Sequence, residues 1–148
     1  MYTCILVPVD GSGFSERAVE EADSLAHALG SKLVLFHAVP QQLPPPVEGL
    51  STATAAQAEK TARTKMEAEA QTVLIAAERR ARFADGKVER HFAVSNCPYD
   101  AILAAAKTFR CDLIVMASHG RRGANAVLLG SETQKVLAHS KVPVLVVK

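Results

Sequence analysis

The sequence predicts an α/β fold in which five parallel strands alternate with helices and form one doubly wound sheet. Short apolar runs recur along the chain, and the run from Leu113 to Met116 is apolar at every position, which is typical of a strand buried on both faces. Between these runs, apolar residues recur at spacings of three or four, the period of a helix packed on one side. Turns rich in glycine and proline separate the two kinds of segment.

The composition is that of one soluble globular domain covering residues 1–148. Hydrophobic residues make up 49% of the 148 positions and charged residues 22%, which is enough apolar material for a sizeable core. The 17 basic and 15 acidic residues give a net charge of +2 without a clustered basic face. We therefore expect binding neither to nucleic acid nor to a membrane surface.

Cysteine usage and the N-terminal residues favour a cytoplasmic location. Cys4, Cys97 and Cys111 are odd in number and lack CxxC spacing, so they indicate neither a disulfide framework nor a zinc site. The first stretch, MYTCILVPVD, lacks the basic segment and the long apolar run of a leader. No run approaches the ~18 apolar residues of a membrane span.

The N-terminal part of the chain predicts one βαβ unit. Residues 3–9 are apolar between their ends and predict a strand, which a turn at residues 10–13 ends. Ser15 is the expected N-cap of a helix whose apolar residues recur at helical spacing up to a C-cap at Gly30. Residues 32–39 predict the second strand, so the crossover is right-handed and the two strands are parallel.

The middle of the chain predicts a loop, a long helix and an edge strand. Three consecutive prolines and a glycine place residues 40–54 in a surface loop. Residues 55–82 predict a helix with a core-facing stripe of mostly small residues: Ala58, Ala62, Met66, Ala70, Val73, Ala77 and Ala81. After a turn at Asp85 and Gly86, residues 88–95 alternate between apolar and polar, as expected for a half-exposed edge strand.

The next helix and the last helix have recognisable beginnings. Asn96 is the expected cap of a helix that has Pro98 in its first turn and ends before residue 112. Ser131 is the expected N-cap of a helix over residues 131–140 that buries Val136 and Leu137. The first turn of this last helix, after a loop with glycines at 120, 123 and 130, presents backbone N–H groups and the positive end of the helix dipole, which suits an anion.

The segment from Asp112 to Ser131 resembles the nucleotide-binding signature of the universal stress protein family. In that signature a glycine, two residues, a second glycine, nine residues, and a glycine followed by serine or threonine come after the fourth strand. Gly120, residues 121–129 and the pair Gly130 and Ser131 match this spacing, whereas Ala117 stands in place of the first glycine. The resemblance covers essentially the whole chain, including VPVDGS at the first strand, PYDAIL after the third and KVPVLVV at the end.

The resemblance implies a Rossmann-like sheet of the adenine nucleotide alpha hydrolase type, with strand order 3-2-1-4-5 and helices on both faces. Strands one and four are then neighbours at a topological switch point, where a crevice opens between Asp10 and the loop after strand four. The implied ligands are ATP and Mg²⁺, with Asp10 holding the metal through water. The implied nucleotide-binding residues are Pro8, Val9, Asp10, Ala38, Met116, Ala117, Ser118, His119, Gly120, Arg121, Arg122, Gly123, Gly130, Ser131 and Glu132.

Several of these residues also have a structural interpretation. Asp10 fits a turn former ahead of a glycine. Met116 and Ala38 fit the hydrophobic core equally well. The adjacent Arg121 and Arg122 fit a solvated loop.

The last predicted strand, from Val142 to Val147, suggests a homodimer. It is apolar on both faces, yet the implied order puts it at an edge, and long apolar edges are normally covered or paired. Members of the resembled family often dimerise through this strand.

The resemblance implies a dimeric, ATP-binding regulator of the stress response. A slow ATP hydrolase or an autokinase is one alternative, although the lysine that precedes the serine of a P-loop is missing, and we expect no catalysis by His119. A family member that has lost nucleotide binding and acts through protein contacts is another. A receiver domain fits less well, because Ser95 follows the third strand where a phospho-accepting aspartate is needed.

Overall fold

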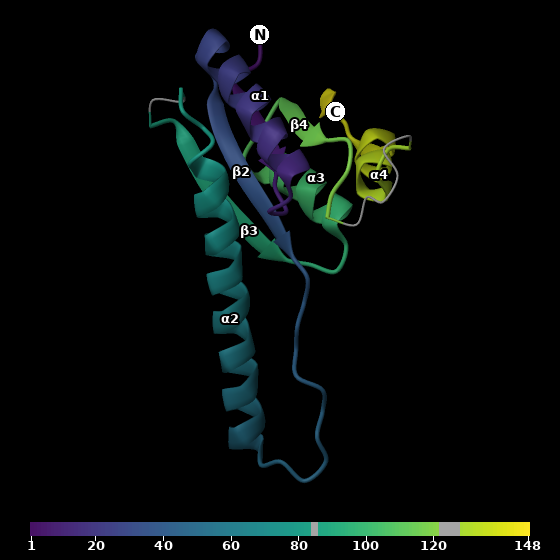
Figure 1. The fold of residues 1–148 in the computed structure, drawn as a ribbon. Helices are drawn as coiled ribbons and strands as arrows, with labels where there is room; N and C mark the ends of the chain where they lie inside the picture. The colour runs from purple at the N-terminus through teal and green to yellow at the C-terminus, as the bar shows by residue number, and fades with distance from the viewer. Residues whose placement is uncertain (84–85, 122–127) are drawn as a thin grey trace.

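The chain forms one five-stranded parallel sheet in the order β3-β2-β1-β4-β5, which confirms the predicted topology (Figure 1). The computed structural model describes residues 1–83, 86–121 and 128–148. The strands are β1 (Cys4–Pro8), β2 (Lys32–Val39), β3 (Val88–Val94), β4 (Leu113–Ala117) and β5 (Val144–Val147). The helices are α1 (Gly13–Leu29), α2 (Thr52–Glu78), α3 (Pro98–Thr108) and α4 (Ser131–His139).

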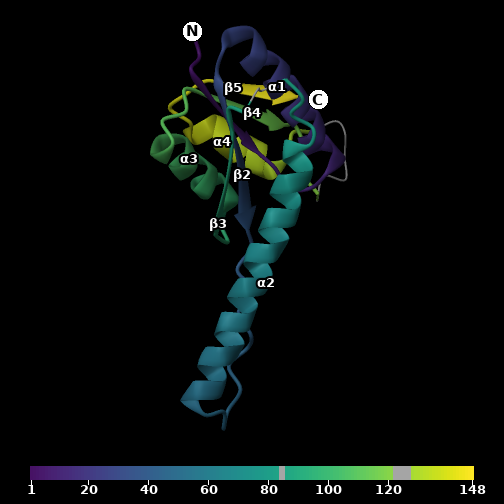
Figure 2. The same cartoon turned by 90° about the vertical axis from the view of Figure 1, so that its left-hand side faces the viewer.

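Helices cover both faces of the sheet, as predicted. Figure 2 shows α1 and α2 on one side of the strands and α3 and α4 on the other. Because successive side chains of a strand point to opposite faces, β1 supplies both cores. Ile5 and Val7 pack with α1 and α2, and Leu6 packs with α3 and α4. All three side chains are fully buried.

The central strand β1 determines which loops meet. Ile5 pairs with Leu33 of β2 on one side and with Leu113 of β4 on the other. Because β1 and β4 are parallel neighbours, their carboxyl ends lie at the same end of the sheet. This is the topological switch point, since the strands that follow β1 and β4 in sequence lie on opposite sides of the pair. Residues after β1 and after β4 therefore lie next to each other, although more than 100 residues separate them.

Three of the predicted helix caps are displaced. The N-cap of α1 is Ser12 and not Ser15: the Ser12 Oγ accepts a hydrogen bond of 3.2 Å from the Ser15 N–H. The N-cap of α4 is Gly130, so Ser131 is already helical. Cys97 and not Asn96 precedes α3, because the Asn96 Oδ1 instead accepts a hydrogen bond of 2.9 Å from the backbone of residue 41. The predicted C-cap at Gly30 is confirmed, with φ at 69°.

Helix α2 starts earlier than predicted and extends beyond the sheet. Ser51 is its N-cap, so the surface loop is shorter than residues 40–54, and the helix ends at Glu78 rather than at residue 82. In Figures 1 and 2 the first half of α2 and the preceding loop project past the end of the strands. The buried side chains of α2 all lie in its second half: Met66, Ala70, Leu74 and Ala77. The predicted stripe is therefore core only from residue 66 onward, and it omitted Leu74.

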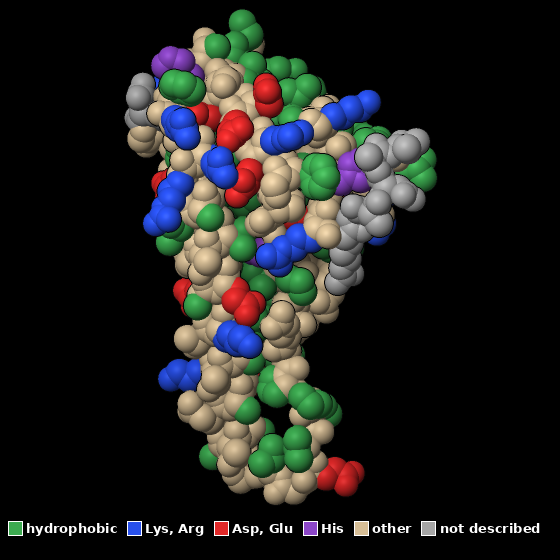
Figure 3. Space-filling model, in the orientation of Figure 1, with side chains coloured by type: hydrophobic (Ala, Val, Ile, Leu, Met, Phe, Trp, Pro, Cys, Tyr) green, Lys and Arg blue, Asp and Glu red, His purple; other side chains and the backbone are tan. Residues whose placement is uncertain are grey.

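A buried aspartate of α1 holds the residues that follow α2. The Asp23 Oδ2 accepts hydrogen bonds from the backbone N–H groups of Arg82, at 2.7 Å, and Phe83, at 2.9 Å. On the surface, Arg80, which also follows α2, pairs with Glu16 of α1 at 2.8 Å and with Glu20 of α1 at 3.3 Å. Figure 3 shows positive and negative side chains interspersed over this face, so no basic patch forms on it.

The two edges of the sheet differ from each other. The predicted edge strand β3 carries exposed charged residues, including Glu89 and Arg90. At the other edge, β5 begins at Val144 instead of Val142, and Leu145 is 44% exposed. Leu137 of α4 was predicted to be buried but is exposed, whereas Val136 is fully buried as predicted. Across the described ranges, no helix has both the length and the apolarity to span a membrane.

Candidate functional site

Asp10, directly beyond the end of β1, is at the centre of the candidate site. Its Oδ1 accepts a hydrogen bond of 2.9 Å from the Ser12 N–H, which closes a tight turn after the strand. Its Oδ2 accepts a hydrogen bond of 2.9 Å from the Arg121 N–H, in the loop that follows β4. One carboxylate thus links the two loops that the topology brings together.

The carboxylate of Asp10 is ionised at neutral pH. Partial burial on its own raises its pKa, but hydrogen bonds from Ser12, Arg121 and Ser15 stabilise the charged form and lower the pKa below its ordinary value of 3.8. Each carboxylate oxygen can accept more than the one backbone hydrogen bond described above. Asp10 can therefore also accept from a metal-bound water, and Mg²⁺ characteristically binds through one or two carboxylates and phosphate oxygens.

Two glycines of the loop after β4 are required by close packing. A Cβ at Gly120 would lie 2.7 Å from the Asp10 Oδ2, so any side chain there would push the carboxylate away. A Cβ at Gly130 would lie 3.2 Å from the Ser118 carbonyl oxygen and 3.4 Å from the His119 Cα. The Gly130 N–H also donates to that Ser118 carbonyl at 2.7 Å. The start of α4 is thus held directly against the end of β4.

The end of β4 is fixed by buried polar contacts. The Thr133 hydroxyl of α4 donates to the Ala117 carbonyl at 2.9 Å. The His119 Nε2 donates to the Leu128 carbonyl, so in the neutral imidazole the Nδ1 accepts from the Ser118 hydroxyl at 3.0 Å. Ser118 and His119 are both buried. These contacts make the strand end a rigid support for the residues beyond it.

The start of α4 has the features of an anion site. Gly130 is the N-cap and has no side chain, so it supplies no capping oxygen to the N–H groups of the first turn. The helix dipole adds a partial positive charge at the same point. The guanidinium of Arg121 lies on the other side of the junction, at the turn after β1, where one of its nitrogens would be 3.3 Å from a Cβ at Gly11.

The structure brings some of the predicted site residues together and leaves others in the core. Asp10, Ser118, Gly120, Arg121 and Gly130 surround the junction of the two loops, with His119 among them. Four others pack in the hydrophobic core or against it: Val9, Ala38, Met116 and Ala117. A place in the core was the structural interpretation given for Ala38 and Met116. Pro8 is the last residue of β1, and Ser131 is exposed at the start of α4. Arg122 and Gly123 lie outside the described residues.

The side chain of Glu132, a predicted nucleotide-binding residue, contacts α3 and its own helix. Its Oε2 accepts a hydrogen bond of 2.9 Å from the Tyr99 N–H in the first turn of α3, and its Oε1 pairs with Lys135 at 3.1 Å. This carboxylate therefore joins the two helices on one face of the sheet.

Sequence reasoning missed three polar residues that shape the site. Ser12 and Ser15 hold Asp10 in its turn, and Thr133 secures the end of β4. The Asp-Gly-Ser order at residues 10–12 is a known turn-forming pattern and could have revealed the Ser12 contact. The role of Thr133 depends on tertiary packing and has no local signal.

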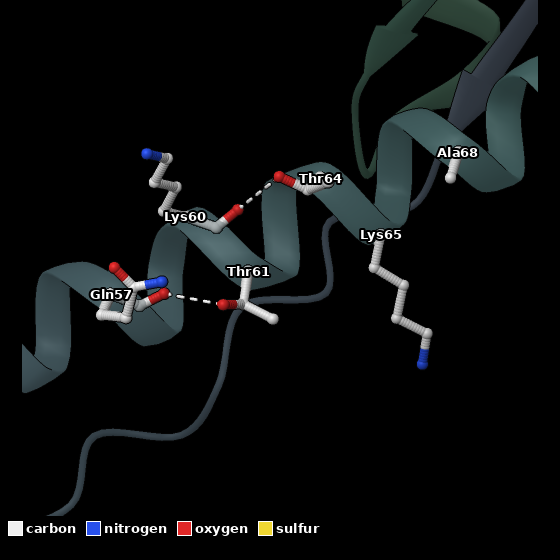
Figure 4. A pocket seen from close by; sticks show the side chains of 6 residues that line it. All are labelled: Gln57, Lys60, Thr61, Thr64, Lys65 and Ala68. Atoms are coloured by element: carbon white, nitrogen blue, oxygen red, sulfur yellow. Dashed lines mark hydrogen bonds between the residues drawn. The ribbon is translucent and has the colours of Figure 1, made fainter.

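The pocket shown in Figure 4 lies away from the loop junction and is lined by α2 alone. It is lined by Gln57, Lys60, Thr61, Thr64, Lys65 and Ala68. The hydroxyls of Thr61 and Thr64 donate to carbonyls of their own helix, each at 3.0 Å, so they do not present their protons outward. In the described ranges, no three His, Cys, Asp or Glu side chains gather as metal ligands.

The fold and the loop junction define a doubly wound α/β protein that has a glycine-containing loop and a helix N-terminus at its switch point. The model of the universal stress protein family matches residues 1–148, and the chain belongs to that family. A universal stress protein of Thermus aquaticus, from the QAH/OAS sulfhydrylase 3' region, is 33% identical and is covered completely, as is this chain.

Two solved structures extend the comparison. Protein MJ0577 of Methanocaldococcus jannaschii superposes with a TM-score of 0.79 at 26% identity, covering 100% of this chain and 96% of that one. A universal stress protein crystallised in complex with cAMP superposes with a TM-score of 0.71 at 30% identity, covering 99% and 97%.

Proposed function

We propose that the chain is a dimeric, cytoplasmic regulator of the stress response that binds an adenine nucleotide, ATP with Mg²⁺, at the junction of the two loops. The observation that carries this proposal is the hydrogen bond from the Arg121 N–H to Asp10, with Gly120 packed against the same carboxylate, because it joins a charged group to a glycine loop at the switch point of the sheet. The relative bound to cAMP, at 30% identity, supports an adenine nucleotide as the ligand.

Different residues of this chain would bind the phosphates and the metal ion. The backbone around Gly120 and Gly130 and the first turn of α4 hold the phosphates, because they combine N–H groups with the helix dipole. Arg121 offsets part of the phosphate charge. Asp10 accepts from waters of the magnesium ion, which supplies charge neutralisation for the phosphates.

The first experiment identifies any resident ligand. The purified protein is denatured, the polypeptide is removed, and the released small molecules are identified by mass spectrometry. ATP or ADP at about one per chain supports the proposal, and a ratio of ATP to ADP that falls on incubation points to the slow hydrolase. A protein that is empty and also gives no calorimetric signal with Mg-ATP contradicts the proposal and favours action through protein contacts.

A pair of variants tests whether the glycine loop is the site. Gly120→Ala places a Cβ 2.7 Å from the Asp10 Oδ2 and displaces the carboxylate. We expect its affinity for Mg-ATP to fall at least about tenfold, the equivalent of one lost hydrogen bond. Gly13→Ala is the matched control, because a Cβ at Gly13 meets nothing within 4 Å. Equal affinities in the two variants would remove Gly120 from the site.

A further inference from the structure

Two cysteine thiols lie in contact at the end of the sheet opposite the candidate site. Cys4 begins β1, Cys111 comes two residues before β4, and their Sγ atoms are 3.0 Å apart. Both side chains are buried, with 6% and 5% of their surfaces exposed. A disulfide has an S–S length of ~2.05 Å, so the two sulfurs would need to approach by only about 1 Å.

The backbone on both sides of the pair is held in place. The Asp112 N–H donates to the Cys4 carbonyl at 2.9 Å, and the Asp112 carboxylate accepts from the Cys4 N–H at 3.0 Å. The Cys111 N–H donates to the Ala106 carbonyl at 2.8 Å. The sulfurs therefore stay in register with each other, because neither chain segment can slide without breaking these bonds.

We propose that Cys4 and Cys111 form a dithiol that hydrogen peroxide converts into an intrachain disulfide joining β1 to β4. One thiolate attacks a peroxide oxygen, which breaks the O–O bond, releases hydroxide and leaves a sulfenic acid. The second thiol attacks that sulfur and water leaves. In total, two thiols are oxidised and one peroxide is reduced, giving one disulfide and two waters.

Burial affects how the pair reacts. Burial, together with the adjacent Cys4, raises the pKa of the Cys111 thiol and so disfavours its thiolate. Whichever sulfur takes the oxygen first, the other thiol lies in contact with it and resolves the sulfenic acid. Burial of both sulfurs also favours a small oxidant over a bulky disulfide reagent. Cys97 is exposed and remains open to reagents of any size.

The test uses the complete chain carrying Cys97→Ser, which removes the exposed thiol and so prevents linkage between chains. After treatment with hydrogen peroxide, we expect an intact mass lower by about 2 Da from the two lost hydrogens, restored by dithiothreitol. Trypsin then releases residues 1–17 and 111–121 as one disulfide-linked pair, because cleavage follows Arg17, Arg110 and Arg121. The oxidised protein should melt about 5 to 10 °C higher, since the bond closes a long loop.

Two results would overturn the proposal. One is retention of both thiols at a peroxide dose that oxidises Cys97 in the unsubstituted chain. The other is overoxidation of Cys4 to a sulfinic acid without a linked peptide pair. The double variant Cys97→Ser/Cys111→Ser provides the control for chemistry, because it has no resolving thiol and should show a sulfenic acid at Cys4 instead of the loss of about 2 Da.

Discussion

Two aspartates carry much of the local order around β1, one at each end of the strand. Asp10 fixes the loop beyond its carboxyl end. Asp112 fixes its beginning, because the carboxylate accepts from the backbone N–H and hydroxyl of Thr3, the shorter of these contacts being 2.8 Å, and from the N–H of Cys4. Neither carboxylate has a basic side chain as its main partner, so backbone hydrogen bonds keep both ionised.

The contribution of Asp112 to stability depends on pH. Partial burial on its own raises its pKa, but hydrogen bonds from Cys4 and Thr3 lower it below the ordinary value of 3.8. Since the folded-state pKa is below the unfolded value, the stabilisation is present above about pH 3.8 and is lost as the pH falls through the folded pKa. We expect Asp112→Asn to lower the free energy of unfolding by about 1 to 3 kcal/mol at pH 7, because one backbone donor then faces an amide NH₂.

Urea denaturation at pH 7 and at pH 3 checks this prediction. The difference in free energy of unfolding between Asp112→Asn and the original chain should be smaller at pH 3 than at pH 7, because pH 3 lies below the ordinary carboxyl pKa of 3.8. Glu21→Gln is the control, because it removes the same charge from an exposed position of α1. An equal difference in the free energy of unfolding at both pH values would show that the ionised carboxylate is not what stabilises β1.

At the scale of elements, the side chains that α2 buries against the rest of the protein all lie in its second half. Leu74 is fully buried between α1 and the sheet, whereas its neighbour Ile75 is 39% exposed. We expect Leu74→Ala to lower the free energy of unfolding by about 2 to 5 kcal/mol, because it leaves a cavity in a packed core. Ile75→Ala is the matched control and should cost about 1 kcal/mol or less. Thermal unfolding followed by circular dichroism measures both, and equal losses would contradict the observed orientation of the helix.

The sequence predicted the number, type and order of these elements well, because alternation of apolar runs with helical stripes is a strong signal. It did not predict where α2 leaves the sheet, since the stripe of small residues continues unchanged from Ala58 to Ala77. The cap of α1 was wrong because Ser12 and Ser15 have similar capping propensities, and the choice depends on the turn that Asp10 makes.

The part of the candidate site that follows from the strand order could be predicted. Asp10 and Gly120 meet because β1 and β4 are neighbours, and the strand order was implied by the resemblance to the family. The contact of Glu132 with the first turn of α3 was not predicted, because this partner comes from a distant part of the sequence. Contacts of this kind depend on the relative position of two helices, about which a local pattern contains no information.

At the scale of the whole molecule, the two sheet edges allow a direct test of the proposed homodimer. We expect the chain to sediment as a dimer joined through the strand at residues 142–147, and Leu145→Glu to shift it to a monomer, because a charge would be buried at the apolar edge. Val94→Glu is the control, since Val94 of β3 is 45% exposed at the opposite edge and Leu145 is 44% exposed. Analytical ultracentrifugation distinguishes the outcomes, and a monomer at micromolar concentration without any substitution would rule out the dimer.

The position of β1 in the middle of the sheet also affects how the protein is made. The partner of Ile5 in β4, Leu113, is added 108 residues after it, which takes roughly 5 to 20 s at ordinary rates of translation. During that time β1 can pair with β2, while its other edge, apolar and intended for β4, has no strand to bind. The nascent chain therefore carries an open strand edge until β4 has been synthesised, and an unpaired edge of this kind is exposed to pairing with other chains.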